Sequence, residues 1–141
     1  MTITNKNLLY PELSYKLNGI FFKIHNELGR FRNEKQYSDA IEQLLKNEGV
    51  SYKREYNLPV SFSGEAKNRN VVDFLIEDKL ILEIKAKTRV SNEDYYQVLR
   101  YLNSVNYELG LIVNFRRYHL VTKRVLNTAL FKGRYSEYSD S

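Results

Sequence analysis

The first third of the chain carries apolar residues at the spacing of two amphipathic helices. The first stripe follows Pro11, ends before Gly29 and consists of Leu13, Leu17, Ile20, Phe21, Ile24 and Leu28. This spacing predicts a helix over residues 12–28. A second stripe follows Asn33, whose side chain can cap a helix while Gln36 bonds back to it. It predicts a second helix that ends near residue 49.

From residue 50 the pattern shortens towards a period of two, which is typical of strands. Residues 50–62 predict a first strand, and the turn residues at 63–64 follow it. Residues 71–76 and 80–87 are rich in β-branched residues and flank a polar segment of three residues. They predict an antiparallel hairpin.

The last third predicts a helix, a buried strand and a polar end. Ser91, with Asp94 three residues on, caps a helix whose apolar stripe reaches residue 102. Residues 109–115 are almost continuously apolar, which predicts a central strand covered on both faces. We expect a short strand over 119–123, a last turn or two of helix over 125–131, and a polar tail over 132–141. The order predicts one α/β domain with a mixed sheet over residues 1–141, its core about 12–126.

Composition narrows the chemistry that this domain can support. The chain has 141 residues, 43% hydrophobic and 28% charged, which excludes a disordered or coiled-coil protein. No apolar run is long enough to span a membrane and the start lacks a signal peptide, so we expect a cytoplasmic protein without membrane contact. It has no cysteine and two distant histidines, so any metal must be held by oxygen.

The positive charge is concentrated near the end of the chain. The net charge is +5, and residues 115–134 contain six basic residues and no acidic one. Such a field suits a polyanion such as nucleic acid. A merely solvated basic face is an equal alternative. The sequence leaves open whether the protein forms a homodimer.

The predicted hairpin brings two acidic residues together. A three-residue loop at 77–79 places Asp73 opposite Glu83, with Lys85 on the same face. A loop of two or four residues would shift this pairing by one. Facing carboxylates destabilise a sheet unless a cation compensates them, and with the carbonyl of Ile84 they offer the hard oxygen ligands that Mg²⁺ prefers, Mn²⁺ being a substitute. An ordinary solvated face is the alternative, which the apolar character of both strands disfavours.

These residues resemble the core of a known family. Asp73 followed after nine residues by Glu83-Ile84-Lys85 resembles the D…(D/E)-x-K pattern of the PD-(D/E)XK nuclease superfamily, which has a restriction-endonuclease-like fold. The chain is more specifically similar to the small GxxExxY family, through residues 25–29, 34–37 and 111–115. It departs from that family at Gly29-Arg30-Phe31-Arg32, which lacks a second glycine, and Val72 stands where the superfamily name has proline.

The resemblance implies a metal-dependent nuclease that hydrolyses phosphodiester bonds in nucleic acid, with DNA the expected substrate. Asp73, Glu83 and the Ile84 carbonyl would hold Mg²⁺, and Lys85 would orient the attacking water. Glu34 is a candidate further ligand, although its place in the first turn of a helix is sufficient explanation by itself. The alternative is a non-catalytic nucleic-acid-binding or protein-interaction domain that retains the fold.

Further candidates lie on the helix after the hairpin and in the basic segments. Gln97 and Tyr101 lie one turn apart and resemble the Gln-x-x-x-Tyr motif of RecB-like members of the superfamily. Gln97 would then hydrogen-bond a phosphate or a metal-bound water. Tyr101 would stack on a base, hold Gln97 in place or belong to the core. Candidate contacts to the nucleic-acid backbone are Lys87, Arg89, Arg100, Arg116 and Arg117. We expect His25 to bond a carbonyl rather than to act as a base.

Overall fold

The computed structural model describes residues 10–127. The elements in chain order are α2 (Pro11–Leu28), α3 (Glu34–Asn47), β1 (Tyr52–Asn57), β2 (Val71–Ile76), β3 (Leu80–Lys85), α4 (Asn92–Val105), β4 (Leu109–Asn114) and β5 (Val121–Leu126). The capping boxes expected at Asn33 and at Ser91 are both present, and they begin α3 and α4. These helix starts are therefore fixed by local hydrogen bonds.

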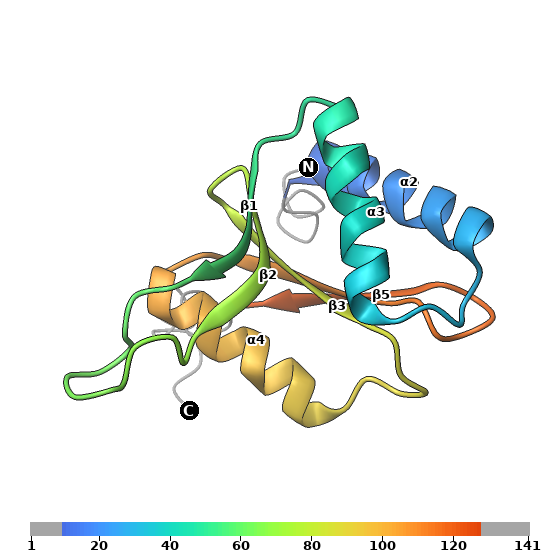
Figure 1. Cartoon of the computed structure of the whole chain (residues 1–141). Coiled ribbons are helices and arrows are strands. Elements are labelled where there is room, and N and C mark those ends of the chain that lie inside the picture. Colours follow the sequence, from blue (N-terminus) through green and yellow to red (C-terminus); the bar gives the residue numbers. More distant parts are fainter. Residues whose placement is uncertain (1–9, 128–141) are drawn as a thin grey trace, which may run out of the picture.

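The five strands form one mixed sheet in the order β1-β2-β3-β4-β5 (Figure 1). Neighbouring strands are antiparallel except β3 and β4, which run parallel and are joined by α4. A parallel pair needs such a crossover connection. The predicted α/β fold class with a mixed sheet is confirmed.

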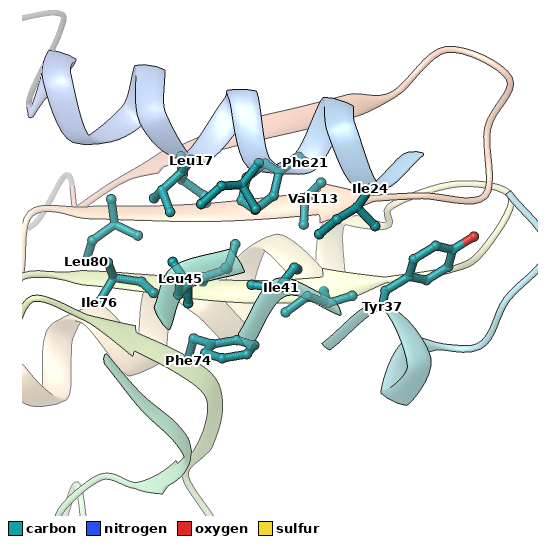
Figure 2. Close-up of a cluster of buried hydrophobic side chains, with 14 of the residues drawn as sticks. Leu17, Phe21, Ile24, Tyr37, Ile41, Leu45, Phe74, Ile76, Leu80 and Val113 are labelled. Carbon is teal, nitrogen blue, oxygen red and sulfur yellow. The ribbon is translucent and has the colours of Figure 1, made fainter. Parts of the chain in front are cut away.

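Helices cover both faces of the sheet, and each face has its own apolar core. In Figure 2, side chains of α2 and α3 such as Phe21 and Ile41 point towards the strands. On β3, Leu82 and Ile84 belong to this core, whereas Ile81 packs against α4 on the other face. Because side chains alternate along a strand, Glu83 and Lys85 fall on the α4 side.

Two predicted details of the sheet are wrong. The first strand, Tyr52–Asn57, is shorter than residues 50–62. The predicted strand over 109–115 is confirmed as an interior strand covered on both faces, because every residue of β4 is buried and β3 and β5 pair with its two edges. Val125 pairs with Gly110 inside β5, so the helix expected from residue 125 does not begin there. Strand pairing along the otherwise unpaired edge of β4 outweighed the weak helical preference of these residues. Residues 128–131 and the expected tail 132–141 lie outside the described residues.

None of the helices within residues 10–127 combines the length and the apolar character that crossing a membrane requires.

We predict that Gly110 sets how closely α4 approaches the sheet. A Cβ atom at this position would lie 2.6 Å from Val98 Cγ1 and 3.4 Å from the Ile81 carbonyl oxygen. Gly110→Ala should therefore lower the free energy of unfolding in urea by about 1–3 kcal/mol, because it overpacks the core. Adding Val98→Ala should make the effect of Gly110→Ala smaller than it is in the wild-type background.

The matched control is Gly19→Ala, because no atom lies within 4 Å of a Cβ built there and the glycine is inside α2. This change should raise the free energy of unfolding by about 0.5–1 kcal/mol. Equal stability of Gly110→Ala and wild type would contradict the packing argument.

Candidate functional site

The antiparallel pairing of β2 with β3 stops one residue short of the acidic pair. Its last ladder pair is Phe74 with Leu82, in the register expected from the three-residue loop. Beyond it, the Asp73 N–H donates to Glu83 Oε2 at 2.8 Å, and the Ile84 N–H donates to Asp73 Oδ2 at 2.7 Å. Each carboxylate thus takes the place of a main-chain carbonyl. The two acids are adjacent, as predicted, but each bonds to the backbone of the opposite strand.

The strand β1 is also irregular beside this point. The ladder of β1 with β2 includes the residues on either side of Glu55 and Asp73 but not this pair. Glu55 has a φ of 49°, a left-handed conformation that costs a non-glycine residue about 1 kcal/mol. Val72 packs with the α4 core and Phe74 with the α2–α3 core, so the alternation of faces shifts at Asp73. The shift turns the Asp73 carboxylate towards β3.

Burial disfavours the state in which both acids of the pair are ionised. Glu83 is 5% exposed, and burial, followed by the charge of Asp73, raises its pKa to about 8. Burial likewise raises the pKa of Asp73. The main-chain N–H donors and the charge of Lys85 act in the opposite direction on both groups. A cation beside the pair would therefore favour the ionised form of both acids.

The donor atoms around the pair are of the kind that a hard divalent cation accepts. The Ile84 N–H points towards Asp73, so the Ile84 carbonyl lies along the same edge of β3. Within residues 10–127, no three His, Cys, Asp or Glu side chains converge into a metal-binding group. Two carboxylates and a carbonyl nevertheless suit Mg²⁺, which keeps several waters and uses few protein ligands. The residues present fit such an ion.

Lys85 is held beside the pair by an acid from α4. Its Nζ lies 3.7 Å from Asp94 Oδ1, and Lys87 Nζ donates to Asp94 Oδ2 at 2.6 Å. Burial alone would raise the pKa of Asp94, but hydrogen bonds from Lys87 and Ser91 and the charge of Lys85 lower it to about 2. Asp94 thus stays ionised and orients both lysines. The sequence pattern identifies Asp94 only as a capping residue, because its distance from Lys85 depends on the packing of α4.

Glu34 reaches the end of β3 from the first turn of α3. Its Oε2 accepts from the N–H of Ala86 at 3.3 Å, and its charge contributes to the raised pKa values of Asp73 and Glu83. It does not complete a three-carboxylate group with them. Glu34 is beside the site, and its role as a metal ligand stays a prediction.

The two residues of the motif on α4 have different surroundings. Gln97 is half-buried and lines a surface cavity of about 500 Å³ with Glu93, Tyr96 and Arg100. Tyr101 is 5% exposed within the α4 core, and burial, followed by the charge of Glu83, raises its pKa to about 12. A ring this deeply buried offers no face to a base. The core interpretation of Tyr101 therefore replaces the stacking one.

The predicted backbone-binding cations divide into two groups. Arg89, Arg100 and Arg117 are exposed. Lys87 instead bonds to Asp94, as described above, and Arg116 donates to main-chain carbonyls of the loop between α2 and α3. His25 Nε2 lies 3.0 Å from the Arg117 carbonyl oxygen, which confirms the expected carbonyl contact.

Two comparisons with known proteins concern the chain as a whole. The comparison with curated proteins gives no match. A solved structure described as "Crystal structure of SSO0001" is similar with a TM-score of 0.50 and 16% identity, over 91% of this chain and 63% of that one. This chain thus spans less than two thirds of that protein, and the likeness concerns the fold alone.

The family comparison covers most of the described residues. The sequence model described as "PD-(D/E)XK nuclease superfamily" matches residues 11–125, from the start of α2 into β5. This range includes Asp73, Glu83 and Lys85, while the narrower GxxExxY assignment stays a prediction. The chain belongs to the PD-(D/E)XK nuclease superfamily.

Proposed function

We propose that this protein is a metal-dependent nuclease that hydrolyses phosphodiester bonds in nucleic acid, with DNA as the expected substrate. The observation that carries the proposal is the adjacent pair of Asp73 and Glu83, bonded across the open end of a hairpin, with Lys85 next to it. Buried, adjacent carboxylates destabilise a fold unless a cation compensates them, so such a pair marks a candidate functional site. Membership of a nuclease superfamily supports the same chemistry.

The acidic pair is the natural place for the metal. Asp73, Glu83 and the Ile84 carbonyl would hold Mg²⁺, or Mn²⁺ as a substitute, and Glu34 is the candidate for a further ligand. When bound, the ion supplies Lewis acidity and lowers the pKa of a bound water. The carboxylates fix its position, because both sit on strands and each is held by a main-chain N–H.

The remaining residues would act on the phosphate. The ammonium of Lys85, oriented by Asp94, would hold the attacking water and stabilise the negative charge that develops on the phosphate oxygens. Gln97 would donate a hydrogen bond to a phosphate oxygen. The exposed Arg89, Arg100 and Arg117 would bind the backbone, which gives affinity without sequence recognition.

Cleavage should require all three core side chains. Asp73→Ala, Glu83→Ala and Lys85→Ala should each lower kcat by at least about 100-fold, since each removes a charge that acts in the transition state. Labelled single- and double-stranded DNA and RNA, incubated with Mg²⁺, Mn²⁺ or chelator, measure this. The control is Asp78→Asn, an exposed acid at the turn of the same hairpin. Wild-type rates in folded Lys85→Ala would contradict the mechanism, and absent cleavage with intact binding would favour the non-catalytic domain.

The buried acid should give the metal-free protein a distinctive pH dependence. The unfolded chain releases the Glu83 proton near pH 4.5, whereas the native state holds it to about 8. This contribution to stability is therefore full below about pH 4.5 and is lost as the pH rises to 8. In chelator at pH 8, Glu83→Gln should melt about 3 °C or more above wild type, and the gap should close towards pH 5.

The same melting experiment tests metal binding. Mn²⁺ at pH 8 should raise the melting temperature of wild type by mass action on the native state. It should not raise that of Asp73→Asn, whereas the control Asp78→Asn should respond like wild type. No response of wild type to Mn²⁺ together with a substrate analogue would argue against the metal site.

Binding to the backbone should depend strongly on salt. Arg117→Ala should reduce the slope of log K against log salt by about 1, equally for all sequences, because it removes one phosphate contact. Arg69→Ala, which changes another exposed arginine in the loop between β1 and β2, is the control and should leave the slope unchanged. An unchanged slope in Arg117→Ala would show that this arginine faces away from the ligand.

A further inference from the structure

The loop between α2 and α3 presents a phenylalanine to solvent beside the candidate site. Phe31 is 76% exposed. Three residues later, Glu34 bonds to the N–H of Ala86, the neighbour of Lys85. Three peptide units limit the distance between the Cα atoms of Phe31 and Glu34 to about 11 Å. The loop that carries Phe31 therefore leads directly into Glu34, which bonds next to the acidic site.

This loop is anchored along its length, although it has no regular structure. Arg116 donates from Nε to the Arg30 carbonyl at 2.6 Å and from Nη2 to the Arg32 carbonyl at 2.9 Å. The Tyr37 hydroxyl donates to the Gly29 carbonyl at 2.6 Å and accepts from the Arg32 N–H at 3.2 Å.

Tyr37, which holds this loop through its hydroxyl, is itself fixed by the core. Tyr37 is fully buried and stacks on Phe115, with ring centroids 4.3 Å apart. In Figure 2 its hydroxyl oxygen points away from the other labelled side chains, at the end of the core cluster. A side chain carried by such a loop loses little conformational freedom when it binds a ligand. The exposure of Phe31 is thus a fixed feature of the surface.

Two guanidinium groups lie over parts of the Phe31 ring, and the residue is still largely exposed. The guanidinium carbon of Arg30 lies 4.9 Å from the ring centroid and that of Arg116 lies 5.9 Å from it. Most of the ring stays open, as its exposed fraction shows, and Arg32 and Arg117 are exposed close by in the chain. Aromatic rings set among cations bind single-stranded nucleic acid, since every unpaired base has a free face to stack. Bases inside a duplex have no such face.

We propose that Phe31 is a stacking platform for an unpaired base, so that the site prefers single-stranded or frayed nucleic acid to blunt duplex. This inference rests on the proposed function, which identifies nucleic acid as the ligand. Arg116 is a positioning residue here, because it acts through the loop carbonyls.

Binding without cleavage tests the proposal directly. The full chain in chelator is titrated with fluorescent single-stranded DNA of about 12 nucleotides and with a blunt duplex, and anisotropy is measured. Phe31→Ala should weaken single-strand binding about 5- to 100-fold, the loss expected for one stacked base, and leave duplex binding within about twofold. Phe31→Leu should weaken single-strand binding as much as Phe31→Ala does, whereas Phe31→Trp should keep wild-type affinity. Phe62→Ala, 63% exposed in another loop, is the control and should change nothing.

A spectroscopic signal separates stacking from a general loss of structure. The chain contains no tryptophan, so Phe31→Trp introduces a single tryptophan whose emission is distinct from that of the tyrosines. Single-stranded DNA should quench it, and the same titration of Phe62→Trp should show no quenching.

The outcomes distinguish this inference from the nuclease proposal. Undiminished single-strand binding by Phe31→Ala overturns the platform, even if wild type cleaves DNA. A selective loss supports the platform, even if wild type proves inactive as a nuclease. Failure of wild type to bind any oligonucleotide in chelator overturns the platform, whereas cleavage with Mg²⁺ or Mn²⁺ decides the nuclease proposal separately.

Discussion

Two hydrogen bonds at the open end of the β2–β3 hairpin hold the functional end of the molecule together. Where the strands separate, their N–H groups would lose carbonyl partners, and orphaned donors are costly inside a protein. Asp73 and Glu83 supply the missing acceptors from their side chains. The same bonds therefore satisfy the backbone and fix both carboxylates. A site on two strands is held more accurately than one on loops.

The acidic pair is destabilising, and the rest of the fold offsets it. Bringing an ionised group into a protein interior costs several kcal/mol, whereas each buried large apolar side chain contributes about 1.5–3 kcal/mol. The strand β3 lies in the middle of the sheet and contributes side chains to the cores on both faces. A few of these contacts are enough to compensate one buried acid. Natural proteins commonly accept such local conflicts at functional sites.

Long-range polar ties then set the position of the surrounding charges. Asp94 on α4 forms ion pairs with both Lys85 and Lys87. Arg116 from the β4–β5 loop donates hydrogen bonds to carbonyls of the loop between α2 and α3. Figure 1 shows these loops at the same end of the sheet. Basic residues near the site thus have a structural role, in addition to any role in binding a ligand. Residue type alone does not separate these roles, because both use a cation on a long side chain.

The sequence by itself determined the elements whose signals are local. The capping boxes at Asn33 and Ser91 join residues three apart, and the three-residue turn sets the hairpin register, so the acidic pair could be predicted. Tertiary structure alone decided the position of β5, the burial of Tyr101 and the contact of Asp94 with Lys85. It also decided the shift of faces at Asp73 and Glu55. Periodicity describes one segment at a time, whereas these features depend on which neighbour each segment meets once the sheet and α4 have packed.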